Sequence, residues 1–520
     1  MTAKRRYDAL SSERSQFLNV AKQAADLTLP YLIRGEEQNT SGMRHLPTPW
    51  QSIGAKGVVT LSAKLMLALL PPQTSFFKLQ VDESMLGQFG PEVKSELDLS
   101  FSKIERTILD AIAASDDRVV VHQAIKHLVV TGNALLFMSK KGLKLYPLNR
   151  YALERDGNGN VIEIVTKELI NKDLLEEEYP SYKPPEPNLV MDTSSSNGED
   201  IEVYTHIKRE GSRFIWHQEI DDKILPKSKG TAPLDSNPWI ALRFNVVDGE
   251  AYGRGRVEEF LGDLKSLEAL SQAVVEGSAA AAKVVFTVSP SSTTKPSTLA
   301  QAGNGAIIQG RPDDIGVVQV GKTADFATAY QMIQTLERRL SEAFLILSVR
   351  QSERTTAEEV RMTQMELEQQ LGGLFSLLTV DFLVPYLNRK LKVFAGAGKI
   401  PKIPDEVVRI TIVAGINALG RGQDRDSLTQ FLQTLAGTMG PESIGQYINP
   451  LEVVKRLAAA QGIDILNLVK TEDQMQQEMQ AQSQQAQDME MTKQASKFAQ
   501  VDQAAAEAEL NAEQNSIPPN

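Results

Sequence analysis

The pattern of apolar residues predicts two helices between residues 324 and 396, joined by a short polar loop at residues 348–355. In the first helix, residues 324–347, the apolar positions recur every three or four residues, at Met332, Leu336, Leu340, Phe344 and Leu347. The second helix, residues 355–396, begins with Thr355 and Glu358 in the spacing of a capping box. At about 1.5 Å per residue it would be roughly 60 Å long. We expect kinks near the glycine pair at 372–373 and near Pro385.

Residues 1–254 alternate between helical and strand periodicity and predict a mixed α+β domain. Helices are expected over residues 1–35, 50–70, 91–115 and 118–131. The second of these would bury a face made by Trp50, Val58, Leu61, Leu65 and Leu69. Strands are expected at residues 76–81, 134–139, 143–148 and 239–245. Two hairpins should turn at residues 156–159 and 211–212, and residues 171–200 have the composition of a surface loop.

After residue 254 the pattern becomes helical again, so the whole chain is expected to be α+β and predominantly helical. Residues 255–288 form one apolar face, at Val257, Phe260, Leu261, Leu264, Leu267 and Leu270. Residues 289–323 break into short strands among Pro, Ser and Gly. A strand is expected at 410–413 and a helical module at 424–470. Residues 471–520, rich in Gln, Ala, Met and Glu, fit either a long helix or a disordered segment.

Composition excludes several kinds of site. The 520 residues include no cysteine, which rules out disulfides and thiolate chemistry, and the five histidines lack the spacing of a metal site. The N-terminus has no apolar core of a secretory signal, and the longest apolar run, residues 58–70, is interrupted by Lys64 and too short to cross a membrane. We therefore expect a soluble protein with no metal and no membrane contact. A net charge of −11 argues against tight binding of nucleic acid.

One segment, residues 316–323, matches the phosphate-loop pattern GxxxxGK[ST]. Such a loop wraps phosphates with backbone amides and follows a buried strand. Here a polar turn precedes it, and the valines within it favour a strand. A strand followed by a helix start is the favoured interpretation, and a nucleotide-hydrolysing motor using Lys322 and Thr323 is the alternative. The chain contains no HExxH or GxSxG motif, so we expect no catalytic residues and no cofactor.

The polar loop at residues 348–355 holds the candidate site residues Arg350 and Arg354. A charged loop between two helices can project into a cleft or channel, or it can be solvated and pair with Glu353. The same two interpretations apply to three cations on the flanking helices: Lys283, Arg338 and Arg339. The residues alone leave this choice open.

Five blocks of sequence resemble the head-tail connector, or portal, proteins of short-tailed podoviruses of the autographivirus type. They are PWQSIGAKGVVTLSAKLMLALLPPQT (49–74), HQAIKHLVVTGNALLF (122–137), GEAYGRGRVEEFLGDLKSLEAL (249–270), ERTTAEEVR with the following ELEQQLGG (353–373) and GINALGRGQD (415–424). The blocks follow the order of that family along most of the chain. Residues 171–200 and the segment beyond 471 are not covered well.

The resemblance implies a dodecameric ring around a channel for double-stranded DNA, used in packaging and ejection. It implies a division of the chain into a wing (1–254), first stem helix (255–288), clip (289–323), second stem helix (324–347), tunnel loop (348–355), long kinked helix (355–396), return to the wing (397–423), crown (424–470) and tail (471–520). The implied partners are a terminase packaging motor, a tail adaptor, the major capsid and scaffolding proteins, and internal core proteins. The implied location is the portal vertex of the virion, after synthesis in the host cytoplasm. In this scheme Arg350 and Arg354, together with Lys283, Arg338 and Arg339, would contact DNA in the channel.

Overall fold

The computed structural model divides the chain into two compact units, Met1–Leu419 and Gly420–Asn520, which we describe separately. The structure describes residues 2–33, 46–71, 76–81, 91–139, 142–171, 179, 200–281, 285–292, 295–303, 307–309, 311–318, 323–346, 373–401, 408–412, 421–439, 448 and 453. Arg350, Arg354, Lys283 and Lys322 lie outside these residues, as do the expected tunnel loop and the tail from 471 to 520. Within the described part, no helix is long and apolar enough to cross a membrane.

Four helices build the first part of unit 1: α1 (Ala3–Asp26), α2 (Ile53–Leu69), α4 (Pro91–Ala113) and α5 (Asp117–Thr131). The apolar face predicted for α2 is confirmed for Val58, Leu61, Leu65 and Leu69, which are at most 2% exposed. Trp50 was wrongly assigned to that face and is 48% exposed. The reason is that α2 begins only at Ile53, and the Trp50 amide ahead of it donates a 2.8 Å hydrogen bond to Glu268 instead.

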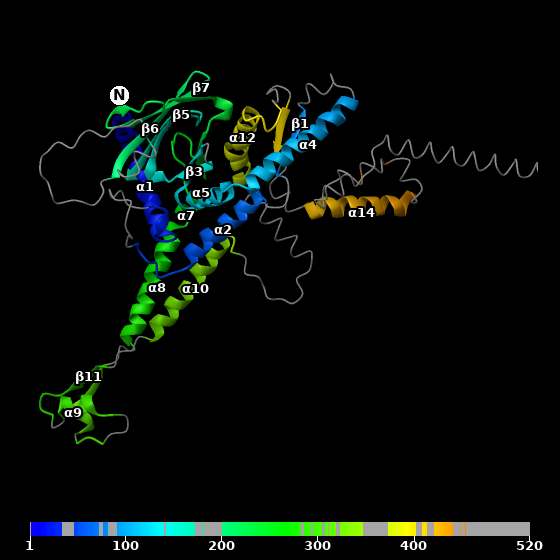
Figure 1. Ribbon diagram of the computed structural model, residues 1–520. Helices are drawn as coiled ribbons and strands as arrows, with labels where there is room; N and C mark the ends of the chain where they lie inside the picture. The colour runs from blue at the N-terminus through cyan, green and yellow to red at the C-terminus, as the bar shows by residue number, and fades with distance from the viewer. Residues whose placement is uncertain are drawn as a thin grey trace, which may run out of the picture. The chain divides into compact units, whose positions relative to one another are not determined.

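Two antiparallel sheets pack against α1 and α5 (Figure 1). The smaller has the order β10-β2-β3, and the larger runs β4-β5-β6-β7-β8, with β9 also paired to β7. Their strands are β2 (Asn133–Ser139), β3 (Gly142–Tyr146), β4 (Tyr151–Arg155), β5 (Val161–Asn171), β6 (Asp200–Glu210), β7 (Arg213–Ile220), β8 (Lys223–Ile224), β9 (Gly230–Pro233) and β10 (Trp239–Arg243). Both predicted hairpins are confirmed, because β4 pairs β5 across 156–159 and β6 pairs β7 across 211–212.

A third pairing joins distant parts of the sequence. β1 (Phe77–Val81) lies antiparallel to β13 (Val408–Ile412), with Leu79 opposite Ile410. The two strands predicted at 76–81 and 410–413 are therefore both present, with small shifts of their ends. Their pairing returns the chain to the first part of unit 1 after the helical segment that precedes it.

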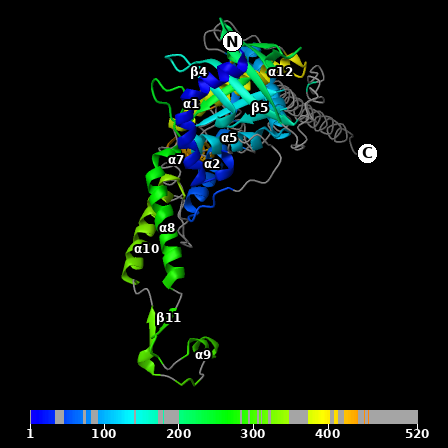
Figure 2. The ribbon, with the colours of Figure 1, turned by 90° about the vertical axis from the view of Figure 1, so that its left-hand side faces the viewer.

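Two long helices lie side by side and extend away from the sheets (Figures 1 and 2). They are α8 (Leu261–Ala281), which follows the short helix α7 (Arg256–Glu259), and α10 (Thr323–Ala343). We call this pair the stem. The body is the remainder of unit 1, without the segment 285–318 that lies between the two stem helices in sequence. Between the two helices in sequence lie β11 (Val285–Val288), α9 (Pro296–Gln301) and β12 (Ile315–Val318), and β11 pairs with β12.

This arrangement corrects two boundaries drawn from the sequence. Residues 285–288 were assigned to the first stem helix, but they form strand β11, which pairs antiparallel with β12. Val, Phe and Thr, the residue types of this segment, favour strands. The second stem helix was expected to reach residue 347, and α10 ends at Ala343. The backbone of Leu345 has a φ of +55°, which a right-handed helix cannot contain.

The described part of the expected helix 355–396 is helical from residue 373 onward. A π-helical turn (η5, Thr379–Leu383) interrupts the α-helical hydrogen-bond ladder and leads into α12 (Val384–Gly396). Pro385 lies within the first turn of α12, and because proline has no N–H, it cannot donate the hydrogen bond expected at that position. In unit 2 the described helix is α14 (Arg421–Met439), which begins three residues before the segment 424–470 expected to be a helical module and overlaps its first part.

Candidate functional site

The stem helices are held together by a narrow apolar seam. Leu264 and Leu267 of α8 and Leu336 and Leu340 of α10 are at most 9% exposed. Farther from the body, the ring of Phe326 on α10 lies directly against Gly277 on α8, since a Cβ atom there would be only 2.7 Å from the ring. Glycine, which has no Cβ atom, leaves room for this ring. The seam predicted for the first stem helix is confirmed by the burial of Val257, Leu264 and Leu267.

Acidic residues outnumber basic ones on the stem. The sequences of α8 and α10 contain six Asp or Glu residues and three Lys or Arg residues. Arg339 is paired with Asp263 at 3.0 Å, and its side chain is 59% exposed, so this ion pair contributes little stability. Arg338 is exposed and has no ion pair with any residue in the described ranges. Of the five predicted DNA-contacting cations, the structure places these two on α10 and leaves the other three undescribed.

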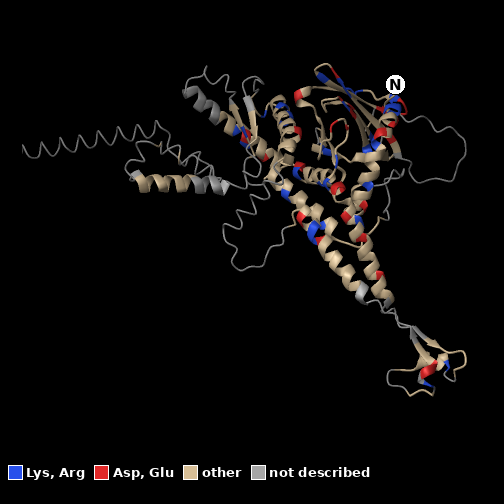
Figure 3. Ribbon diagram, turned by 180° about the vertical axis from the view of Figure 1, so that it is seen from behind, with Lys and Arg blue, Asp and Glu red and all other residues tan. Residues whose placement is uncertain are grey.

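The part of the stem away from the body is almost without charge. In residues 269–281 and 326–336, Glu276 is the one charged residue, and Figure 3 shows these stretches of the ribbon almost entirely in the colour of uncharged residues. Val275, Tyr330 and Met332 are about half exposed on this part. Met332 was wrongly predicted to belong to the buried face, because α10 turns the neighbouring Ile333 toward the core instead.

Where the stem meets the body, backbones approach too closely for side chains. Gly132 has a φ of +76°, and a Cβ atom there would lie 2.5 Å from the Gly253 carbonyl oxygen. A Cβ on Gly253 or Gly255 would likewise come within 2.7 Å of backbone atoms. The Asn133 side chain, only 2% exposed, binds both backbone polar groups of Gly253: it accepts a hydrogen bond from the N–H and donates one to the carbonyl oxygen, each at 2.8 Å. The segment that leads into α7, and from there into the stem, is thus fixed to the start of β2.

Two cations bind the carboxyl end of α10. Lys64, on α2, donates a 2.6 Å hydrogen bond to the carbonyl oxygen of Leu345, and burial lowers the pKa of its ammonium group. Arg256, at the start of α7, donates to the carbonyl of Ala343 at 3.2 Å. Sequence reasoning treated Lys64 only as the interruption of an apolar run. That interruption was the available signal, because a lone charge on a buried helix face needs a partner.

The phosphate-loop alternative does not fit the backbone. Gly316, Val317 and Val318 lie in β12, opposite Thr287, Phe286 and Val285, so their amides are not arranged as a loop around an anion. Thr323 is the first residue of α10. The favoured interpretation, a strand followed by a helix start, agrees with the structure at both ends of the segment.

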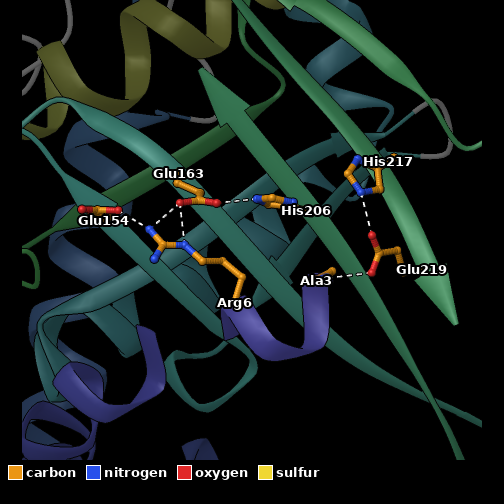
Figure 4. A network of polar contacts seen from close by, with 7 residues as sticks. All are labelled: Ala3, Arg6, Glu154, Glu163, His206, His217 and Glu219. Atoms are coloured by element: carbon orange, nitrogen blue, oxygen red, sulfur yellow. Dashed lines mark hydrogen bonds and ion pairs between the residues drawn. The ribbon is translucent and has the colours of Figure 1, made fainter. Parts of the chain in front are cut away.

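A second polar cluster ties the amino end of α1 to the larger sheet (Figure 4). Arg6 donates a 2.8 Å hydrogen bond to Glu163 and also pairs with Glu154, while His206 contacts the other oxygen of Glu163. On the neighbouring strand, Glu219 accepts from the Ala3 amide at 2.6 Å and from His217 at 2.9 Å. Glu219 therefore caps the helix, a role that the helix's own Thr2 side chain does not fill.

This cluster is structural. Burial alone would raise the pKa of Glu163, but the hydrogen bonds from Arg6 and His206 outweigh it and lower the pKa below its ordinary value. A carboxylate held charged by a cation is a poor general acid at neutral pH. Across the described ranges, no group of three His, Asp or Glu side chains is arranged to hold a metal ion. His127, which is buried, has its pKa lowered to about 4 by burial and stays neutral.

Comparison with known proteins extends these observations. A family model described as bacteriophage head to tail connecting protein matches residues 1–466. The portal protein of Enterobacteria phage T3 is 37% identical over 490 residues, which cover 91% of this chain and 89% of that protein. The portal protein of Escherichia phage T7 is 36% identical over 495 residues, covering 93% and 91%. Among solved structures, the neck of an empty GTA particle computed with C6 symmetry aligns with a TM-score of 0.40 and 11% identity, over 80% of this chain and 90% of that chain.

The family match and the relatives cover the body, the stem and the glycine-rich contacts between them. They confirm the resemblance seen in the five sequence blocks. The chain therefore belongs to the bacteriophage head-to-tail connecting proteins, the portal proteins, which are structural rather than enzymatic and form the head-tail connector at the portal vertex of the virion.

Proposed function

We propose that copies of this chain close into a ring, with the stems around a central channel for double-stranded DNA. The observation that carries this proposal is the exposed apolar surface of the stem: Val275, Tyr330 and Met332 are 50%, 56% and 53% exposed. Large apolar side chains exposed on an element of only two helices favour burial against other protein surfaces. Neighbouring stems in a ring supply that surface on both sides of each subunit.

The charge of the stem suits the passage of DNA. Six acidic and three basic residues give it an acidic excess, and the whole chain has a net charge of −11. Because affinity for DNA depends on cations that displace counterions from phosphates, such a wall binds the duplex weakly. The five proposed contact cations, Arg350, Arg354, Lys283, Arg338 and Arg339, would touch the phosphate backbone transiently. Phosphate contacts of this kind carry no sequence information.

The remaining assignments follow the resemblance. We propose a ring of twelve subunits, with residues 1–254 as the wing, 289–323 as the clip and 424–470 as the crown. The clip would face the terminase motor during packaging and the tail adaptor afterwards, while capsid, scaffolding and internal core proteins would contact the wing and crown. Strand β12 lies in this clip and pairs with β11, which ends at Val288 immediately before it, and Ile307 between the two strands in sequence is fully exposed. A two-stranded sheet of this size is marginal by itself, so contacts with neighbours would stabilise it.

The ring is tested by single-particle electron microscopy of the purified chain together with its mass in solution. We expect closed rings with a hole wide enough for a DNA duplex. A protein that stays at the monomer mass of 57.2 kDa, alone and with its capsid partners, would contradict the proposal.

The role of the loop cations is tested by Arg350→Ala and Arg354→Ala in assembling phage. We expect both to alter packaging or retention of DNA while rings still form, because each removes one phosphate contact. Lys223→Ala, in the exposed strand β8 of the body, is the matched control and should change neither. Normal packaging and retention in both arginine variants would remove the role assigned to this loop.

A further inference from the structure

The carboxyl end of α10 differs from what its sequence favours. The apolar pattern continues in helical register through Leu347, yet the helix stops at Ala343 and Leu345 has a left-handed backbone with a φ of +55°. Leucine is a good helix former, so local preference would extend the helix here. Contacts with other parts of the chain must therefore hold this end in its bent form.

The hydrogen bonds at this end form a complete Schellman motif, but its left-handed position is occupied by Leu345 and not by glycine. The amide of Ile346 donates to the carbonyl of Ser341 at 2.7 Å, and that of Leu345 donates to Glu342 at 3.1 Å. Glycine usually occupies the left-handed position of this motif, because a Cβ atom is disfavoured there. For a leucine, the left-handed conformation is roughly five- to thirty-fold less populated than the right-handed one.

Two cations from the body compensate for the unfavourable backbone conformation of Leu345. If α10 continued as a helix, the carbonyls of Ala343 and Leu345 would accept amides four residues later. In the bent form the Ala343 carbonyl accepts from Arg256 at 3.2 Å and the Leu345 carbonyl from Lys64 at 2.6 Å. Cations at a helix carboxyl end are also favoured by the helix dipole. The Lys64 contact exists only while Leu345 directs its carbonyl toward α2.

The surroundings provide a pivot and room to move. Phe344 is fully buried against α2, where a Cβ atom on Gly57 would lie 2.6 Å from its ring. Next to it, a cavity of about 370 Å³ is lined by Leu345 and by neighbours that include Leu61, Leu374 and Leu377. A strained residue beside a cavity can change its backbone without displacing a packed core.

We propose that residues 344–346 are a two-position joint between the stem and the body. In the observed position, Lys64 and Arg256 hold α10 bent at Leu345. In the second position Leu345 adopts a right-handed backbone, the Lys64 contact is lost and α10 continues past Ala343. Lys64 and Arg256 are the positioning residues, and the joint couples α2 to the stem. Its biological role, adjusting the stem as DNA passes, rests on the proposed function.

The joint is tested by high-resolution electron microscopy of purified assemblies, without DNA. Lys64→Met removes the ammonium group and keeps the length of the side chain; Lys56→Met, on an exposed face of α2, is the matched control. We expect the fraction of subunits with α10 extended past Ala343 to rise at least fivefold in Lys64→Met and to stay unchanged in the control. An α10 that ends at Ala343 in Lys64→Met, as in the parent, would overturn the proposal.

A second comparison separates backbone preference from packing. Leu345→Gly and Leu345→Ala both remove the leucine side chain, but only glycine accepts the left-handed backbone freely. In the Lys64→Met background we expect glycine to restore the bent end and alanine to leave it extended. With Lys64 intact, alanine should raise the extended fraction and glycine should not, so the comparison stands even if Lys64→Met fails to fold. The same helix end for glycine and alanine in both backgrounds would refute the joint.

Packaging by the same variants separates the joint from the function. A longer α10 in Lys64→Met accompanied by altered DNA packaging, with both reversed by Leu345→Gly, supports a working joint. A longer α10 with normal packaging overturns its coupling to DNA passage. Assemblies that are not rings would contradict the proposed function, while the comparison of helix ends would still decide on the joint.

Discussion

A buried ion pair between α5 and α12 gives a quantitative test of how the long helix is held to the body. Asp117, 1% exposed, accepts a 2.6 Å hydrogen bond from the hydroxyl group of Tyr386 and pairs with Lys390 at the same distance. These partners are more than 260 residues away in sequence. Replacing Lys390 by methionine keeps the approximate length of the side chain and removes the ammonium group, which lies 5.5 Å from the centre of the Tyr386 ring. Within the described ranges, it is the only ammonium group that the structure places on this carboxylate.

The expected loss follows from burial. Removing one partner of a buried ion pair typically costs about 3–5 kcal/mol, because the other charge stays in a low-dielectric environment. Lys390 is 16% exposed, and the Tyr386 hydroxyl still donates to Asp117, so we expect the lower end, about 3 kcal/mol. Lys392, two residues after Lys390 on the same helix, pairs with the half-exposed Asp235. Lys392→Met should cost at most about 1 kcal/mol.

The assay is denaturant unfolding of the purified protein, with the free energy of unfolding compared among the parent, Lys390→Met and Lys392→Met. A double-mutant cycle with Asp117→Asn should then give a coupling energy of about 1–3 kcal/mol for the buried pair. Equal destabilisation by the two lysine variants would refute the reasoning, because it would mean that burial of Asp117 does not set the strength of the contact.

Two further predictions concern the glycine contacts and the cluster at α1. Gly132→Ala would place a Cβ atom on a left-handed backbone, 2.5 Å from other backbone atoms, so it should lower the free energy of unfolding by more than about 3 kcal/mol. Gly157 has open space around it, so Gly157→Ala should change the free energy of unfolding by at most about 0.5 kcal/mol. Arg6 and His206 lower the pKa of Glu163 from 4.5, so the contribution of this carboxylate to stability is complete above pH 4.5 and is lost as the pH falls through the folded-state pKa. The difference in unfolding free energy between the parent and Glu163→Gln, measured from about pH 3 to pH 7, should therefore shrink on the acid side. A constant difference would contradict this.

Local patterns in the sequence were enough for most helices and for both hairpins. The turn at 156–159 could be predicted because glycine and asparagine between two alternating runs favour a tight turn, and β4 and β5 pair across it as expected. The buried face of α2 was readable from its spacing. One error was a shift by one helical position, at Met332, and another placed Trp50 in a helix that begins three residues later, at Ile53. Periodicity gives the direction of a face to within about one residue, and packing decides the rest.

Contacts between charged groups far apart in sequence were not predictable. Arg6 and Glu163 are 157 residues apart, and neither belongs to a motif; nothing in their local sequence distinguishes them from solvated charges. The candidate cations show the same limit, because Arg339 pairs with Asp263 while the adjacent Arg338 has no such partner in the described ranges. Spacing could place both arginines on one helix, but which of them meets a carboxylate depends on how the two stem helices are packed against each other.

The sequence blocks that carry the family resemblance have a common physical meaning. Gly57, from the first block, lies against Phe344 at the end of α10; Gly132, from the second, touches the backbone of Gly253 and Gly255 from the third. The first contact lies just past the end of α10 and the others lie in the segment that leads through α7 into α8, and none of them leaves room for a Cβ atom. These motifs therefore specify an angle between two parts of a subunit rather than a reaction. In the ring that we propose around a DNA duplex, a small change of that angle would be repeated in every subunit. Close packing at these glycines would then keep the width of the proposed channel uniform.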